Sequence, residues 1–218
     1  MSSDESLKSP HWPMPHYNLG PPDFIHALGA VAATFNSLES WLRALFITYT
    51  RMPEGAAAAL FTRLDNQARI DLLKQCIEAT DHSNEIKDAL QHLFAGYAVC
   101  ADNRNILMHA QTATVKFQRS PEKTQVLFFK PPKSTPLIAN TYSPSLPRLR
   151  GIADSMNAFA SFGRDLIIFI GETYNPNFYP PGTRPLRPHT LPKKPVVPRP
   201  LIPDRPSNPK GRRRPHRA

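Results

Sequence analysis

Residues 24–49 read FIHALGAVAATFNSLESWLRALFITY, and this stretch decides the fold class. Its apolar side chains recur at alternating spacings of four and three residues, which is the period of one face of an α-helix. These positions are Phe24, Leu28, Val31, Phe35, Leu38, Leu42, Leu45 and Tyr49. The pattern predicts one long helix, with Asp23 able to cap its start and Pro53 ending it near Met52.

The same period predicts two further helical regions. Residues 55–64 and 67–80 form the first of them, with a break near Asp65, and residues 83–107 form the second. Ser145, which is able to cap a helix, opens another helix that closes near Gly171.

A change of period separates the last two helices. Between about residues 112 and 130, Val115 and Phe117 alternate with polar residues and a second apolar run follows a Ser-Pro turn, which is typical of a β-hairpin. The expected fold is therefore mainly all-α, a bundle of four to five helices with an inserted β-hairpin.

Composition divides the chain into three parts. Residues 1–22 lack any period and are expected to form a flexible arm, residues 23–172 form the helical domain, and residues 173–218 form a tail. Of the 27 Lys and Arg, 11 follow Tyr174, together with 13 of the 25 Pro and only one of the 17 acidic residues. Such a segment buries too little apolar surface to offset its ordering entropy, so the tail is expected to be disordered.

The tail carries the whole positive excess of the chain. Its densest charge is Arg212, Arg213 and Arg214, and such a run can contact the phosphates of RNA without sequence specificity. The alternative is that the tail only keeps the protein in solution.

Several classes of protein are disfavoured. No apolar stretch is long enough for a membrane span and the N-terminus lacks an apolar signal region, so we expect a cytoplasmic protein without membrane association. Cys76 and Cys100 lie on the apolar sides of predicted helices without ligand spacing, which favours reduced, buried thiols. His26 and His92 lack a further metal ligand and phosphate-binding glycine motifs are missing, so we expect no metal and no cofactor.

Arg104 interrupts the apolar seam of the third predicted helix. An unpaired guanidinium is costly to bury, so it needs a partner or a ligand. On a straight helix with about 100° per residue, Asp102, Asn105 and His109 share the opposite face and form a polar patch. Arg104 and His109 point about 140° apart, so they are not expected to converge within one straight helix.

A purely structural interpretation is also open. Arg104 then pairs with a carboxylate such as Glu39 or Asp102, and His109 caps the end of the helix, where a cation is favoured. Glu39 lies between seam residues of the first helix, so it either anchors Arg104 or faces solvent.

The stretch DNRNILMHA at residues 102–110 resembles the signature of the HEPN family, which is Arg, a following polar residue and His. Arg104-Asn105-x-x-x-His109 matches that form, and the similarity extends over about residues 23–171, including RIDLLK at 69–74. The resemblance implies an α-helical bundle that forms a homodimer, in which Arg and His of two copies meet in a shared cleft that often cuts RNA without a metal.

Carried over to this chain, the resemblance assigns Arg104 to the scissile phosphate, His109 to the proton of the attacking ribose 2′-hydroxyl and Asn105 to orienting them, with Glu39 and Asp102 in support. It predicts an endoribonuclease of a toxin or defence type, with RNA and a cognate antitoxin or neighbouring protein as partners. The alternative is a catalytically inactive HEPN-like module that dimerises and binds a nucleic acid or a protein.

Overall fold

The computed structural model describes residues 21–117, 120–130, 140–175, 183 and 189–204. These residues form five helices and one three-stranded antiparallel sheet. The described chain is therefore mainly helical, as its periodicity predicts.

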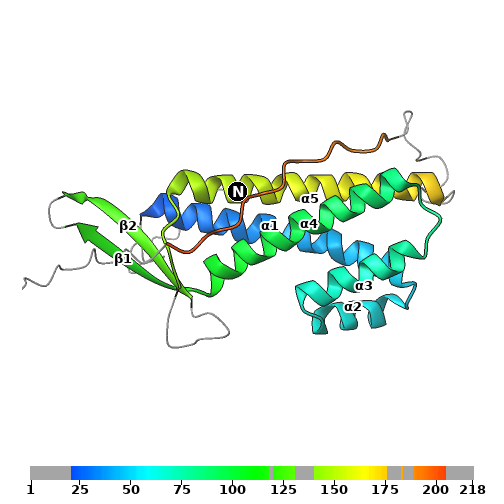
Figure 1. The fold of residues 1–218 in the computed structure, drawn as a ribbon, viewed down its shortest axis with the longest axis horizontal. Coiled ribbons are helices and arrows are strands. Elements are labelled where there is room, and N and C mark those ends of the chain that lie inside the picture. Colours follow the sequence, from blue (N-terminus) through cyan, green and yellow to red (C-terminus); the bar gives the residue numbers. More distant parts are fainter. Residues whose placement is uncertain (1–20, 118–119, 131–139, 176–182, 184–188, 205–218) are drawn as a thin grey trace, which may run out of the picture.

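Three long helices form the body of the domain. α1 (Pro22–Thr50) and α5 (Leu146–Tyr174) run side by side in the same direction, and α4 (Asn84–His109) packs against both in the opposite direction (Figure 1). The predicted seam of α1 faces this core: each of its residues is buried except Leu28, which is half-buried. The helices thus form because each has one apolar face that the other two remove from water.

Two shorter helices, α2 (Glu54–Arg63) and α3 (Asn66–Glu78), cover one end of this body (Figure 1). The predicted break between them is confirmed, because Asp65 caps α3 by accepting a hydrogen bond from the N–H of Ala68 at 2.8 Å. The predicted cap of α1 is wrong. Pro21 holds the N-cap position there, and Asp23 lies within the first turn.

The predicted hairpin is confirmed as β1 (Gln111–Phe117) and β2 (Ser120–Lys130). A third strand, β3 (Asn140–Tyr142), pairs with β2. The sheet projects from the end of the bundle at which α4 ends and α5 begins (Figure 1), and Phe128 and Tyr142 are buried in the core there. β3 is too short to show an alternating pattern, so only its pairing with β2 defines it.

Two further observations concern the helices and the thiols. Within the ranges described above, no helix is both long and apolar enough to cross a bilayer. Both cysteines are free. Cys100 is buried, which raises the pKa of its thiol to about 12, whereas Cys76 is only half-buried, so the prediction of two buried thiols is correct for Cys100 alone.

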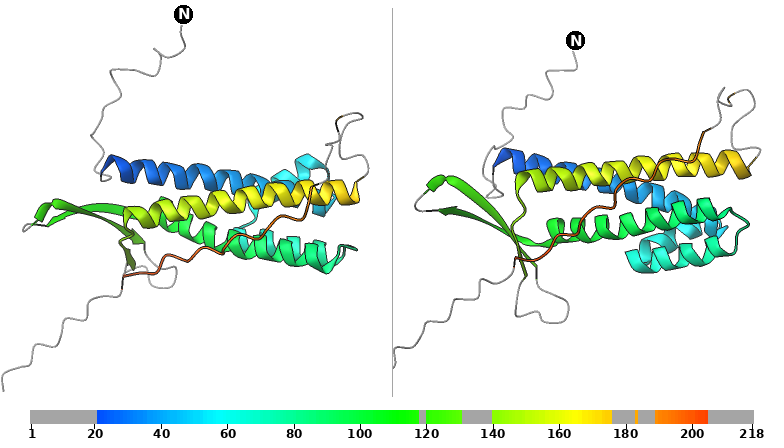
Figure 2. Two further views of the ribbon diagram at one scale, coloured as in Figure 1. Left: turned by 90° about the horizontal axis from the view of Figure 1, so that it is seen from above. Right: turned by 45° about the horizontal axis from the view of Figure 1, so that its top comes forward.

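The prediction of a disordered tail is wrong for residues 189–204, which we call the strap. The strap runs as an extended segment along α4 and α5 towards β3 (Figure 2). Pro198 is buried, and Leu191 and Leu201 pack against the core. The composition argument fails here because side chains of α4 and α5 bind the backbone of the strap, so it does not need a core of its own. Residues 1–20 and 205–218 lie outside the described residues, and the expectations for both segments stay predictions.

Candidate functional site

The three motif residues converge at the C-terminal end of α4. Nη1 of Arg104 lies 2.8 Å from Nε2 of His109 and donates a hydrogen bond to Oδ1 of Asn105 at 3.3 Å. Arg104 and Asn105 are half-buried, and His109 is exposed. The expectation that Arg104 and His109 do not meet within one helix is therefore wrong. The wheel angle describes where the side chains leave the helix, and the long Arg side chain bends back across its surface to reach the imidazole.

The hydrogen bond defines the chemical state of His109. A guanidinium has only donors, so Nε2 of His109 accepts through its lone pair. The imidazole in this contact is consequently neutral, with its proton on Nδ1. A cationic donor and a group that accepts a hydrogen bond thus lie in direct contact.

The ring of Phe35 on α1 lies against the guanidinium of Arg104. The guanidinium carbon of Arg104 lies 5.7 Å from the centre of the Phe35 ring, within the range of a cation–π contact. The Phe35 side chain is buried and also contacts the ring of Tyr97. An aromatic face therefore accommodates this charge inside the apolar seam. Phe35 fits the apolar period of the first helix, so the sequence predicts core packing for it and not the contact with Arg104.

Neither carboxylate proposed for Arg104 lies against it among the described contacts. Glu39 pairs instead with Arg69 of α3, with Oε1 to Nη1 at 2.8 Å. Asp102 is exposed and is not part of the cluster formed by Arg104, Asn105 and His109. The supporting roles expected for Glu39 and Asp102 at Arg104 are thus not met.

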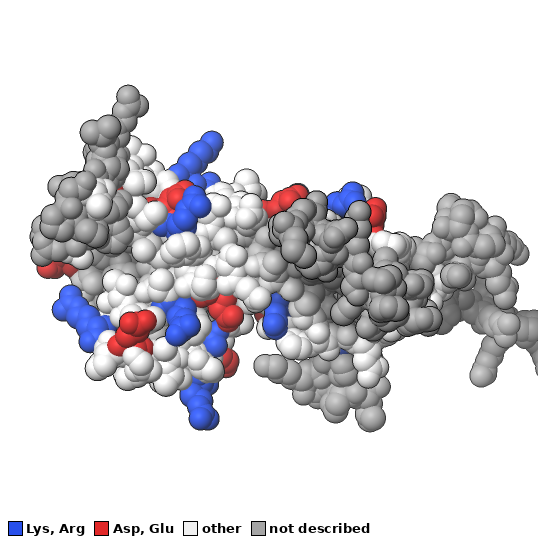
Figure 3. Space-filling model, turned by 180° about the vertical axis from the view of Figure 1, so that it is seen from behind, with Lys and Arg blue, Asp and Glu red and all other residues white. Residues whose placement is uncertain are grey.

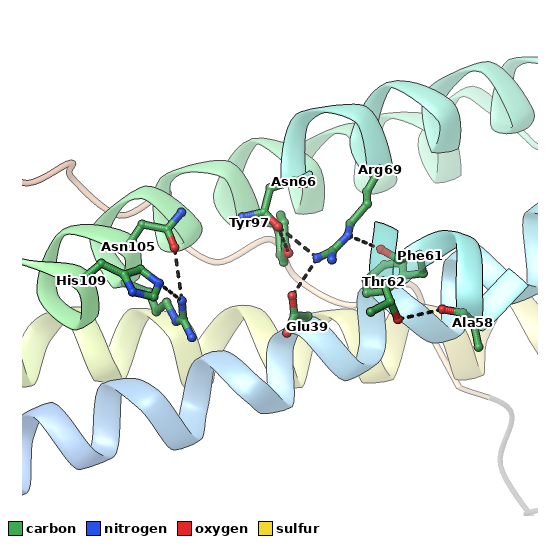
Figure 4. A network of polar contacts seen from close by, with 10 residues as sticks. Glu39, Ala58, Phe61, Thr62, Asn66, Arg69, Tyr97, Asn105 and His109 are labelled. Atoms are coloured by element: carbon green, nitrogen blue, oxygen red, sulfur yellow. Dashed lines mark hydrogen bonds and ion pairs between the residues drawn. The ribbon is translucent and has the colours of Figure 1, made fainter. Parts of the chain in front are cut away.

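Arg69 organises a second polar cluster, farther along α4 (Figure 4). Its Nε donates to the carbonyl of Phe61, and its Nη1 donates to Glu39 and, at 3.1 Å, to Oδ1 of Asn66. Its guanidinium carbon also lies 4.0 Å from the centre of the Phe61 ring. This one side chain therefore joins α1, α2 and α3.

Tyr97 brings α4 into the same cluster. Its hydroxyl donates to Oδ1 of Asn66 at 2.9 Å, and Figure 4 shows it beside Arg69. Burial, followed by the nearby charge of Glu39, raises the pKa of Tyr97 to about 12. A neutral, hydrogen-bonded phenol in the core is a structural feature, so we assign this cluster to stability.

The remaining expected site residues lie elsewhere. Arg212, Arg213 and Arg214 are outside the described residues. His92, for which the sequence predicts no ligand role, binds the strap: its Nε2 donates to the carbonyl of Pro195 at 2.7 Å. No local pattern in the sequence indicates this contact, because it joins positions 103 residues apart.

Comparison of the chain with models of known protein families, with curated proteins and with solved structures gave no significant match.

Proposed function

We propose that this chain is a HEPN-like, metal-independent endoribonuclease that acts as a homodimer with a composite Arg/His site. One observation carries the proposal: the guanidinium of Arg104, the amide of Asn105 and the imidazole of His109 converge at the end of α4. Cleavage of RNA by its own 2′-hydroxyl needs a donor for the phosphate oxygens beside a group that accepts a proton, and this cluster contains both.

In the proposed reaction, Nε2 of His109 takes the proton of a ribose 2′-hydroxyl while that oxygen attacks the adjacent phosphorus. The bond from phosphorus to the 5′ oxygen breaks, and the leaving oxygen takes a proton from an imidazolium. Arg104 donates to the non-bridging oxygens, on which negative charge develops. The products are a 2′,3′-cyclic phosphate and a 5′-hydroxyl.

The proposed homodimer follows from this proton balance. One imidazole cannot accept one proton and donate another at the same moment. A second imidazolium is therefore needed on the other side of the phosphate, and His109 of a second copy supplies it. Arg104 of each copy then helps to neutralise the phosphate between them.

Substrate binding would also activate His109. In the free protein Nη1 of Arg104 donates to Nε2, which is the atom that has to accept the substrate proton. A phosphate is a stronger acceptor for a guanidinium than a neutral imidazole is, because the hydrogen bond is charge-assisted on both sides. Binding of the phosphate draws Arg104 away and frees the lone pair of His109.

The tail is the part of the chain best suited to attract RNA. On the face opposite to that in Figure 1, described Lys and Arg are interspersed with Asp and Glu and separated by uncharged surface (Figure 3). Lys193 and Arg199 of the strap are exposed, and residues 205–218 add six further cations. We therefore expect RNA affinity to depend on the tail and to fall steeply with salt.

One observation favours a second candidate function, that of a catalytically inactive HEPN-like binding module. Arg104 and His109 satisfy each other, and Phe35 covers the guanidinium from the other side. Such a pair can have a purely structural role, in which it stabilises the C-terminal end of α4. In that case dimerisation and the basic tail would perform the function.

The deciding experiment is cleavage of labelled RNA in the presence of EDTA. Wild type is compared with His109→Ala, Arg104→Ala and, as the matched control, His26→Ala, which removes an exposed His from α1. We expect both motif variants to lose about 100-fold or more of the cleavage rate and the control to retain it. Absence of cleavage by wild type on diverse RNAs would favour the binding module.

A mixing experiment tests the composite site. Wild-type and His109→Ala proteins are mixed in known ratios and their subunits are allowed to exchange. A shared site needs His109 from both copies, so mixed dimers should be inactive and the activity should fall more steeply than the fraction of wild-type chains. Activity that falls only in proportion to that fraction would contradict a composite site.

A further inference from the structure

Asn103 is the feature of α4 that the motif does not explain. Its amide side chain is buried, with 0% of its surface exposed. A buried amide is costly unless its donor and its acceptor are both satisfied. Both are satisfied by the strap: Nδ2 donates to the carbonyl of Arg199 at 3.1 Å, and Oδ1 accepts from the N–H of Leu201 at 2.7 Å.

These two hydrogen bonds lie on either side of Pro200, and neither of them involves its side chain. An amide that binds one carbonyl and the N–H two residues later recognises an extended backbone. Arg148 of α5 strengthens this recognition, because its Nη2 donates to the carbonyls of Arg199 at 2.6 Å and of Pro200 at 3.3 Å. Together with His92, which binds the carbonyl of Pro195, α4 and α5 offer mainly donors to the backbone of the strap.

A donor-rich surface suits a proline-rich segment. Pro has no N–H, so a segment rich in Pro presents carbonyls with few donors that need acceptors of their own. The strap has this composition, with Pro at positions 192, 195, 198, 200 and 203.

Side chains add selectivity at both ends of the strap. Near its start, the carboxylate of Glu172 accepts from the backbone N–H and from Nδ1 of His189, each at 2.8 Å, and Asp88 pairs with Lys194. Near its end, the Asp204 carboxylate accepts from the Ser143 hydroxyl at 2.6 Å.

The backbone also continues into the sheet, because the N–H of Asp204 donates to the carbonyl of Thr141 in β3 at 2.7 Å. A cavity of about 470 Å³ lies between this end of the strap and the start of α5. We use the name strap site for the side chains that bind the strap: Asp88, His92, Asn103, Arg148 and Glu172.

We propose that the strap site is a binding site for an extended proline-rich segment, and that it takes this segment from a second copy of the chain as well as from its own. The contacts are identical in the two arrangements, so exchange loses none of them. Reciprocal exchange closes a two-fold dimer, in which each copy supplies the segment that the other requires to satisfy Asn103.

The length of the connection permits the exchange. Residues 176–188 join α5 to the strap, and the contact of His189 with Glu172 places the two ends of this connection close together. Thirteen residues reach about 43–47 Å when extended, which is similar to the length of α5, about 44 Å for 29 residues. The connection is thus much longer than closure within one copy needs.

The test uses the ion pair of Asp88 and Lys194 in the full chain. A carbodiimide joins a carboxylate and an amine only when they touch, so it should form an amide between these two side chains. Equal amounts of ¹⁵N-labelled and unlabelled protein are incubated together and then cross-linked. Mass spectrometry identifies each joined peptide pair as light, heavy or mixed.

Peptide pairs made of one light and one heavy peptide are the result that supports the proposal. Exchange predicts Asp88–Lys194 pairs of one light and one heavy peptide at a yield comparable to that of the unmixed pairs, and Asp88→Asn should abolish all of them. Asn103→Ala, which keeps the ion pair but removes the backbone clamp, should lower their yield severalfold. Unmixed pairs alone, at every protein concentration, would overturn exchange between copies, and the absence of any Asp88–Lys194 link would overturn the strap site itself.

This inference is independent of the proposed ribonuclease. Cross-linking reports on the strap and cleavage reports on Arg104 and His109, so either proposal can fail without the other.

Discussion

Nη1 of Arg104 lies 2.8 Å from Nε2 of His109, although the two residues leave α4 on different faces. α4 is one continuous helix from Asn84 to His109, and the long Arg104 side chain spans the distance between the two groups. The contact needs no second copy, so a single chain already brings the two motif side chains together. A dimer would bring a second Arg104–His109 pair beside the first.

The protonation state of His109 gives a direct check of this contact. Because the guanidinium only donates, neutral His109 should carry its proton on Nδ1. We expect ¹⁵N NMR of the imidazole at alkaline pH to show this tautomer in excess, and Arg104→Ala to remove the excess. A majority of the Nε2-protonated tautomer in the wild type would contradict the hydrogen bond.

Replacement of Arg69 by Lys should destabilise the fold. Lys keeps the charge but loses the hydrogen bonds that join Phe61, Glu39 and Asn66. Since the Arg69 side chain is only 12% exposed, we expect the free energy of unfolding to fall by roughly 1–3 kcal/mol in denaturant titrations. Arg43→Lys, at an exposed position of α1, is the matched control and should leave it unchanged. Equal effects of the two variants would refute the structural role of Arg69.

His82 should make stability depend on pH. Its Nε2 lies 2.8 Å from the Tyr49 hydroxyl, its ring lies against that of Tyr174, and its Nδ1 is buried without a hydrogen-bond partner among the described residues. Burial lowers the pKa of His82, nearby Lys87 lowers it further, and Asp81 opposes both.

The direction of this pH dependence follows from proton binding by the folded and the unfolded chain. Above the ordinary His pKa of about 6.5, both the folded and the unfolded chain are neutral at this position. As the pH falls below that value the unfolded chain binds the proton first, so this contribution to stability is lost until the lowered pKa of the folded state is reached. Denaturant unfolding between about pH 7.5 and 5.5 should show this loss. His82→Gln should flatten the dependence and the exposed His26→Gln should preserve it; unchanged curves for His82→Gln would count against it.

Gly96 of α4 should not tolerate a side chain. A Cβ placed there would lie 1.9 Å from Cε1 of Phe159 on α5, whereas a Cβ at Gly29 of α1 would meet nothing within 4 Å. Gly96→Ala should therefore lower the free energy of unfolding by about 1–3 kcal/mol through overpacking. Gly29→Ala, the control, should raise it by up to about 1 kcal/mol through helix propensity.

A compensating change tests the cause of the Gly96 effect. If the clash with the Phe159 ring is responsible, Phe159→Leu should cost less stability in the Gly96→Ala background than in the wild type. Thermal unfolding of the four proteins gives this coupling. Additive costs would show that Gly96 matters for another reason.

Much of the fold is readable from local periodicity. The seam of α1, the helices α4 and α5, the break at Asp65 and the hairpin of β1 and β2 lie within a few residues of their predicted positions. These features depend on side chains within a few turns or one hairpin of each other, so a short window of sequence contains the information. β3 is missed because its three residues are defined by their partner in β2 alone.

The candidate site is only partly readable. The spacing of Arg104 and His109 identifies two functional candidates, but helix geometry alone predicts that they point apart. Which carboxylate pairs with which guanidinium is also beyond local sequence, and Glu39 lies against Arg69 of α3. Ion pairing depends on how the helices pack, which no spacing within one helix reveals.

Periodicity predicts the long amphipathic helices and the hairpin, and composition places the excess of positive charge after Tyr174. The position of the strap and the partners of Asn103 depend instead on tertiary packing, because the two hydrogen bonds between them join positions 96 and 98 residues apart. Periodicity records which face of a helix avoids water. It does not indicate which distant backbone groups will form hydrogen bonds with a buried amide, because those partners are brought close only when the helices pack.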